Sequence, residues 1–343
     1  MSDVTNAPEA GKVDVKGSGM SRREVRRLRM ASVTPEDRAY LRRKAIAERV
    51  WPFFRAVILT GLGFVIMYPL IYMISCAFRD RMDMSDPTVM WIPRHYTLKV
   101  IAETIDAMDY WKTLGNTLLL NIGCSLVQVV SCALTGYGFA RFRFRGSKLL
   151  FGIVIMMILV PSQVISLPLY TQFRYFGIKG VFSLNLIDSG LTMYLPAMTA
   201  NGIRAGLMIY IFRQFFKGMP RELEDAAYID GCGPLRTFVS VMLPNASAAL
   251  LTVFLFSVVW YWNDYYVSST FFTDTKTIAL MLTNLENELK MNLFNDPTVQ
   301  ISPRDQIVWK EAGCLLSIVP ILTMYVFLQK HFTEGIERSG IVG

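Results

Sequence analysis

The sequence predicts an all-α polytopic membrane protein with six transmembrane helices. The first observation is composition: 52% of the 343 residues are hydrophobic, only 18% are charged, and the mean hydropathy is +0.35. An average soluble domain carries about 25% charged residues. The second observation is a set of long apolar segments, and the third is the uneven placement of basic residues between them. Together they exclude an ordinary soluble domain.

Six segments reach the length of a membrane span. A transmembrane helix needs about 20 mostly apolar residues, and backbone polar groups in lipid must be satisfied within the chain, so each segment is expected to be helical. The predicted spans are residues 53–76, 116–139, 149–170, 191–212, 246–267 and 312–328.

Basic residues set the orientation of these spans. They are dense before the first span and in the loops 141–148 and 213–245, and sparse for the length of the other loops. Basic residues beside spans mark the cytoplasmic side. We therefore predict a multi-pass protein of the cytoplasmic membrane with both termini inside. Because the basic residues behind the net charge of +8 are concentrated beside the spans, we attribute the charge to membrane orientation and expect no nucleic-acid partner.

The first 50 residues form a predicted basic cytoplasmic extension ahead of a membrane domain spanning residues 51–343. About the first twenty are rich in Gly, Ser and charge and are expected to be disordered. A short helix is expected from Pro35 to Arg49, before Pro52. The basic run 22–29 either contacts anionic membrane lipid or serves only as a topology signal.

Metal and disulfide chemistry find little support in the sequence. The five cysteines form no Cys-x-x-Cys pair, and most of them lie in apolar runs. The two histidines, His95 and His331, are far apart. We therefore expect no metal site and no disulfide framework.

A polar stretch at residues 220–244 interrupts the apolar chain. A first short helix is predicted from Pro220 to Ile229, because proline suits a helix start and acidic residues suit its first turns. Gly231 and Gly233 end it, and a second helix is predicted between Pro234 and Pro244. A charged helix-turn-helix between two spans is expected to meet a partner at the membrane surface.

This stretch resembles the EAA loop of ABC-importer permeases, whose pattern is Glu-Ala-Ala, three residues, Gly, nine residues, Ile, one residue, Leu-Pro. The matching residues are Asp225, Ala226, Ala227, Gly231, Val241, Leu243 and Pro244. Aspartate replaces the family's glutamate, and valine replaces its isoleucine.

Further segments are similar to the maltose-type, carbohydrate-uptake branch of that family, the inner-membrane component. They are Asn116-Thr117, Tyr137–Arg141, Pro161–Val164, Leu167–Tyr170, Trp262–Asp264 and the tail from Gln329. The resemblance extends from about residue 53 to the end of the chain.

The resemblance implies a permease subunit, not an enzyme, for ATP-driven uptake of a sugar or oligosaccharide. Its implied partners are a second homologous permease, a cytoplasmic ATPase dimer and an extracellular solute-binding protein. This chain has no phosphate-binding loop of the Gly-x-x-x-x-Gly-Lys-Ser/Thr type, so it needs no cofactor and the partners would bind ATP. The alternatives are the same transporter class for a polyol or glycerol phosphate, and a membrane-embedded enzyme, for which no metal pair or nucleophile motif is found.

The resemblance also implies roles for the loop. Ala226 and Ala227 permit close approach to the ATPase, and Asp225 offers an acceptor to a basic residue on it. Gly231 permits a sharp turn where a side chain would clash, or simply caps the helix. The expected ATPase-coupling residues are Glu222, Glu224, Asp225, Ala226, Ala227, Gly231, Leu243 and Pro244.

Polar residues inside the spans are a second functional signal, because they are costly against lipid. Asn121, Gln128, Asn263 and Asp264 are expected to face a subunit interface or a water-filled translocation path. Asp264 has two interpretations: it lines the path, or it caps and pairs near the outer membrane surface.

Overall fold

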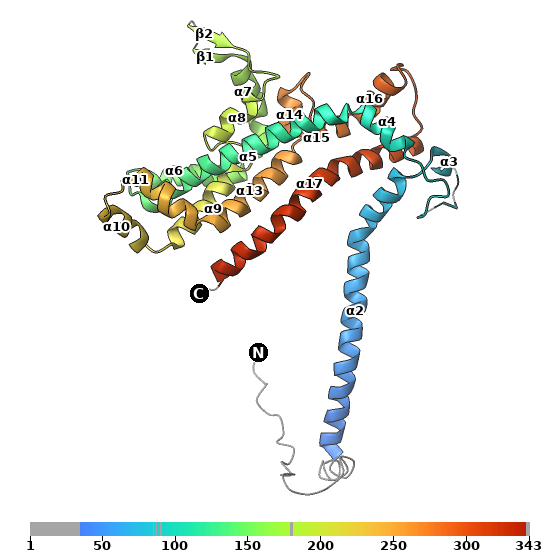
Figure 1. Ribbon diagram of the computed structural model, residues 1–343, viewed down its shortest axis with the longest axis horizontal. Helices are drawn as coiled ribbons and strands as arrows, with labels where there is room; N and C mark the ends of the chain where they lie inside the picture. Colours follow the sequence, from blue (N-terminus) through green and yellow to red (C-terminus); the bar gives the residue numbers. More distant parts are fainter. Residues whose placement is uncertain (1–34, 85, 87, 90, 179–180, 341–343) are drawn as a thin grey trace. The chain divides into compact units, whose positions relative to one another are not determined.

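The computed structural model describes residues 35–84, 86, 88, 89, 91–178 and 181–340, and this part of the chain is mostly helical (Figure 1). Its first helices are α2 (Pro35–Ala77), α3 (Arg81–Met84), α4 (Lys99–Ala107), α5 (Tyr110–Arg141), α6 (Ser147–Leu159) and α7 (Ser162–Arg174). A short antiparallel hairpin of β1 (Phe176–Ile178) and β2 (Phe182–Leu184) follows.

The second half of the chain continues with shorter helices before a long last one. They are α8 (Leu191–Met198), α9 (Ala205–Gly218), α10 (Glu222–Ile229), α11 (Pro234–Thr237), the π-helical segment η1 (Phe238–Met242), α12 (Leu243–Asn245), α13 (Ser247–Trp262), α14 (Tyr266–Phe271), α15 (Ile278–Thr283), α16 (Leu285–Glu288), the π-helical segment η2 (Leu289–Leu293) and α17 (Pro303–Gly340).

The chain divides into two units, residues 1–71 and 72–343. The described part of the first unit is helix α2 up to Ile71. The expectation that a separate helix ends at Arg49 is wrong, because α2 runs without interruption through Pro52 and Pro69. A proline removes one backbone hydrogen bond, which long apolar helices tolerate. The disordered segment and the basic run at residues 22–29 lie outside the described residues.

In the second unit, α5 is the central helix. It packs against α8, α9 and α13, and α17 packs against α13 and α4 (Figure 1). Small residues allow close helix contacts: a Cβ added to Gly136 would lie 2.6 Å from Phe212 Cβ, and one added to Gly206 would lie 2.8 Å from the carbonyl oxygen of Val154. Such close approach is typical of helix packing in membranes.

The buried side chains of this unit form separate clusters. The cluster next to the loop 220–244 includes Tyr137, Phe212, Phe216, Phe238 and Met242. A second cluster, around Trp309, joins α15, α16 and the start of α17. The first cluster holds the loop in place, because Phe238 and Met242 of the loop pack in it against residues of α5 and α9.

The described residues contain three helices long and apolar enough to cross a membrane: Val50–Ala77, Tyr110–Arg141 and Pro303–Phe327. The count rises to five when two bent helix pairs are each taken as one span. The predicted span 149–170 is one of these pairs, with α6 and α7 meeting at 106°. Pro161 explains the bend, because Val160 before it adopts an extended conformation. The count of six stays a prediction.

Candidate functional site

The loop between α9 and α13 forms two helical segments joined by a tight turn. Helix α10 ends at Ile229, and Gly231 follows with a left-handed φ of 80°. The N–H of Cys232 donates to the carbonyl of Ala227 (2.9 Å), and the N–H of Gly231 donates to that of Tyr228 (3.0 Å). These two bonds and the left-handed glycine define a Schellman cap, which satisfies the last carbonyls of the helix.

Gly231 is required for its backbone conformation and not for space. A Cβ added there would meet no atom within 4 Å. The expectation of a side-chain clash at this turn is therefore wrong, because the turn projects away from the rest of the chain. The positive φ alone makes other residues unfavourable at this position.

The second helical segment runs through α11, η1 and α12 and ends at Asn245, one residue after Pro244, where the sequence predicted its end. There the chain turns by 81° into α13. In a regular α-helix the ring of Pro244 clashes with the carbonyl four residues earlier, and the wider π-helical turn before it accommodates the ring. Leu243 packs against the buried cluster, while Pro244 is exposed.

One face of α10 is fixed to the membrane helices by a buried ion pair. Glu224 Oε2 lies 3.3 Å from Arg141 Nε at the end of α5, and the two side chains are only 9% and 6% exposed. Arg141 Nη2 also donates to the carbonyl of Met219 (2.8 Å), just before the loop. Ala227, one turn after Glu224, is buried on the same face. The loop is thus held to the end of α5 by charge as well as by packing.

The other face of α10 and the following turn are open to solvent. Glu222, Asp225 and Ala226 are exposed. Large apolar side chains lie among them: Leu223, Tyr228, Ile229, Leu235 and Val239 are exposed, and Ile229 is 85% exposed. Exposed apolar residues rimmed by charge mark a surface that binds a protein, a membrane or a ligand. We call this surface the loop surface; it consists of Glu222, Leu223, Asp225, Ala226, Tyr228, Ile229, Leu235 and Val239.

The polar residues of the second span lie inside this chain. Asn121 is buried and donates to the carbonyl of Val258 (2.9 Å). Gln128 is also buried; its amide donates to the carbonyl of Ile203 (2.7 Å), and its oxygen accepts from the hydroxyl of Tyr261 (2.6 Å). These side chains join α5 to α13 and to the segment before α9.

Asn263 and Asp264 lie in the short break between α13 and α14. The carboxylate of Asp264 accepts from the N–H groups of Val267 (3.2 Å) and Ser268 (2.9 Å) and from the hydroxyl of Ser268 (3.1 Å). Asp264 therefore accepts hydrogen bonds from free N–H groups at the start of α14, as a helix cap does. Its predicted place near the outer membrane surface stays a prediction. Asn263 is exposed and donates to the carbonyl of Val259.

Replacing Asp264 with leucine is expected to destabilise the junction of α13 and α14 by about 0.5–2 kcal/mol, the usual effect of losing a helix cap. Asp264→Asn retains one acceptor oxygen and is expected to lose less. The measurement is the thermal unfolding midpoint of the purified protein in detergent. An Asp264→Leu midpoint equal to that of the wild type would show that the cap is dispensable.

The predicted span 191–212 is broken in the middle. Helix α8 ends at Met198 and α9 begins at Ala205, and Ala200 and Arg204 in the break have left-handed φ values of 54° and 56°. The side chains of Asn201 and Arg204 are exposed. Sequence analysis missed this break, although two signals were present: an Asn-Gly pair, which favours a turn, and an arginine within an apolar run.

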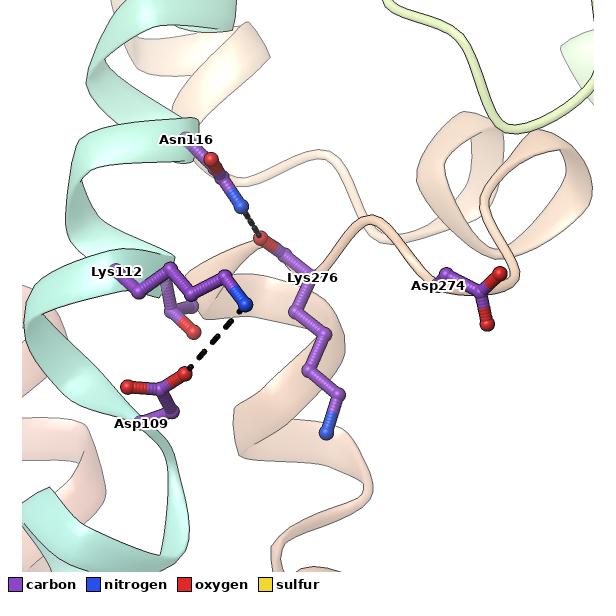
Figure 2. Close-up of a pocket in the computed structure, with 6 residues that line it drawn as sticks. Asp109, Lys112, Asn116, Asp274 and Lys276 are labelled. Atoms are coloured by element: carbon purple, nitrogen blue, oxygen red, sulfur yellow. Dashed lines mark hydrogen bonds and ion pairs between the residues drawn. The ribbon is translucent and has the colours of Figure 1, made fainter.

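A small polar pocket of about 140 Å³ lies where the start of α5 meets the loop before α15 (Figure 2). Asp109, Lys112, Thr113, Asn116, Asp274 and Lys276 line it. The amide of Asn116 donates to the carbonyl of Lys276 (3.3 Å). Sites for drug-sized ligands typically enclose about 300–1,000 Å³, so this pocket is too small for an oligosaccharide. Among the described residues no group of His, Cys, Asp and Glu is placed to hold a metal ion.

The loop that lines this pocket is held by Asp188. One oxygen of its carboxylate accepts from the N–H groups of Thr273 (3.0 Å), Asp274 (3.0 Å) and Thr275 (2.9 Å). Burial raises the pKa of this carboxyl, but the N–H donors outweigh burial and the pKa lies below its usual value. The contact therefore contributes to stability at neutral pH and is lost only when acid protonates Asp188.

Comparisons with known proteins agree with this architecture. The model of the family described as "Binding-protein-dependent transport system inner membrane component" matches residues 133–338, more than half of the chain. The chain is 26% identical to the arabinooligosaccharides transport system permease protein AraQ of Halalkalibacterium halodurans, over 82% of this chain and 93% of that protein. It is 28% identical to the maltodextrin transport system permease protein MdxG of Bacillus subtilis, over 83% and 94% of the two chains.

The fold has a counterpart among solved structures. The chain matches a bacterial ABC transporter involved in the import of the acidic polysaccharide alginate, with a TM-score of 0.67 and 19% identity, over 83% of this chain and 98% of that one. At this identity the likeness supports the fold alone. The family match over residues 133–338 is the finding that decides membership, and the protein belongs to the inner membrane components of binding-protein-dependent transport systems.

Proposed function

We propose that this permease moves a sugar or oligosaccharide into the cell. The observation that carries the proposal is the similarity, along more than four fifths of the chain, to permeases for arabinooligosaccharides and maltodextrin. The alternative is another solute carried by the same class of transporter, such as a polyol or glycerol phosphate.

The loop surface is the proposed ATPase contact. Its exposed apolar side chains would enter a cleft on the ATPase, while Glu222 and Asp225 would meet basic residues at the rim. Ala226 and Gly231 have little or no side chain, so the ATPase could approach the backbone closely there. Because Glu224 ties the same helix to Arg141 at the end of α5, a movement of the loop would be transmitted to a membrane helix.

The family implies an ATPase and a solute-binding protein as partners. We further propose a second homologous permease, packed against apolar surface that is exposed on this chain, and ATP bound only by the ATPase dimer. The proposed path lies between the two permeases. Asn263 stays a candidate for this path or for the interface, because its side chain is exposed. Asn121 and Asp264 would instead support the helices that line it.

We propose six spans with both termini in the cytoplasm. Three of these spans are the long helices. We assign the other three to α6 with α7, to α8 with α9, and to α13 with the short helix α14 that follows it. In this topology the loop surface and Lys148 face the cytoplasm, and Thr283 faces outward.

Cysteine labelling tests this topology. In a variant lacking the five native cysteines, a cysteine at Thr283 is expected to react with an impermeant maleimide in intact cells. A cysteine at Lys148 is expected to react only after the membrane is permeabilised. Both native side chains are exposed, so access within the fold does not limit either reaction. The reverse labelling pattern would contradict the orientation.

The solute class is tested on the binding protein of the same transport system. Its thermal midpoint is measured against a panel of oligosaccharides, polyols and glycerol phosphate. We expect an oligosaccharide to raise the midpoint most and to stimulate ATP hydrolysis by the assembled transporter. A shift produced only by a polyol or by glycerol phosphate would favour the alternative.

A further inference from the structure

Arg204 lies at the break between α8 and α9, beside the apolar helix α5. The residues before and after Arg204 contact α5 and give its level along that helix. The carbonyl of Ile203 accepts a hydrogen bond from Gln128, and the carbonyl of Ala205 lies 3.9 Å from the sulfur of Cys132. At 1.5 Å per residue, these α5 positions lie about 14–20 Å from the helix end at Arg141 and about 27–33 Å from its start at Tyr110. That level falls within a hydrocarbon core of about 30 Å.

Contacts with α5 and α13 hold the break between α8 and α9 in place. Gln128 lies against Gly202 and bonds Tyr261 on α13, and a Cβ at Gly202 would lie 2.5 Å from the Tyr261 hydroxyl. Two residues with side chains, Ala200 and Arg204, hold left-handed conformations that cost of order 1–3 kcal/mol each. A buried network thus stabilises an unfavourable backbone at this level. In membrane proteins, such irregular backbone occurs where it is buried in protein or lines a water-filled cavity.

The side chain of Arg204 is exposed on this chain, and within the described residues it forms no ion pair or hydrogen bond. A guanidinium facing lipid at this depth costs about 2.5–3.5 kcal/mol on insertion scales. The charge is therefore best placed facing the water-filled path between two permeases.

We propose that Arg204 binds a negatively charged group of the transported solute, so that the substrate is an acidic carbohydrate such as a uronic-acid oligosaccharide. This inference rests on the proposed function and names the substrate class. The planar guanidinium of an arginine donates two parallel hydrogen bonds to a carboxylate or a phosphate. A neutral sugar would leave this charge without a counterion.

The first test needs no knowledge of the solute. A single cysteine at Asn201, three residues before Arg204, reports the local potential in the assembled transporter. An anionic methanethiosulfonate is expected to react about ten times faster, relative to a cationic one, with Arg204 present than in an Arg204→Gln background. An Arg204→Lys background is expected to keep the preference. Absence of reaction with both reagents, or a ratio unchanged by Arg204→Gln, would overturn the inference.

The second test identifies the charged group. Uptake by the complete transporter is measured with a galacturonic-acid trisaccharide, a phosphorylated sugar and a neutral trisaccharide. We expect uptake of an acidic solute that falls at least about tenfold in Arg204→Gln and partly recovers in Arg204→Lys. The control Lys148→Gln removes an exposed charge elsewhere and is expected to retain wild-type uptake.

The outcomes separate the two claims. Uptake of the neutral trisaccharide alone, unchanged in Arg204→Gln, would overturn the inference and leave the proposed function intact. Loss of copurification with the second permease in Arg204→Gln would mean that Arg204 pairs with that subunit and would also overturn it. Uptake of none of the carbohydrates would contradict the proposed function, and with it the substrate class.

Discussion

Replacing Glu224 with alanine is expected to destabilise the protein by about 3–5 kcal/mol, because Arg141 would be left as a buried charge without its partner. The double variant Arg141→Met/Glu224→Leu removes both charges and is expected to recover most of that loss. The measurement is the thermal midpoint of the purified complex, followed by tryptophan fluorescence.

Glu224→Gln separates stability from coupling. It preserves the size of the side chain and removes the charge, so we expect a smaller loss of stability than in the alanine variant. If the pair transmits movement from the loop to α5, transport per ATP hydrolysed falls in both Glu224→Gln and the double variant. A double variant as unstable as Glu224→Ala would show that the ion pair is not the cause.

Replacing Gly202 with alanine is expected to cost about 2–5 kcal/mol, from overpacking and from the loss of buried hydrogen bonds. The added Cβ would displace the amide of Gln128, which bonds Ile203 and Tyr261. The break would then lose the contacts that hold it. The measurement is the thermal midpoint together with uptake by the assembled transporter.

Gly115→Ala is the matched control for Gly202→Ala. A Cβ at Gly115 in α5 meets no atom within 4 Å. Alanine is favoured over glycine in a helix by roughly 0.5–1 kcal/mol, so this variant is expected to be as stable as the wild type or slightly more so. Equal midpoints for Gly202→Ala and the wild type would contradict the role of the network around the break.

Local signals were readable from the sequence. The end of α10 follows from Gly231 and its neighbours, and the caps and turns of the loop surface depend on residues close together in the chain. The break at Asn201-Gly202 was also readable, but the apolar residues on both sides dominated the reading of a continuous span. Pro52 had the opposite effect: it suggested the end of a helix, whereas α2 continues through it, because a long apolar helix tolerates a proline.

Contacts between distant residues were not readable. Glu224 and Arg141 are buried against each other because α5 and α10 meet in space, and nothing in the spacing of the chain indicates this. Gln128 was expected to face an interface or a path; it is satisfied instead by a carbonyl exposed at the break and by a hydroxyl of α13. A polar side chain within a span predicts that it has a hydrogen-bonding group beside it. Which group that is depends on how the helices pack.

The loop surface is proposed to bind the ATPase, and Ile229→Asp tests this contact most directly. Ile229 is 85% exposed and contributes little to the fold of this chain. The matched control is Val181→Asp; Val181 lies in the turn between β1 and β2 and is 75% exposed. Both variants are expected to keep the thermal midpoint of the chain and its copurification with the second permease.

The measurement is ATPase copurification and ATP hydrolysis stimulated by the loaded binding protein. A charge at the centre of an apolar contact typically costs 2 kcal/mol or more, so both readouts are expected to fall at least about tenfold in Ile229→Asp. ATPase copurification is expected to be unchanged in Val181→Asp. Wild-type copurification and stimulated hydrolysis in Ile229→Asp would contradict the assignment of the loop surface as the ATPase contact.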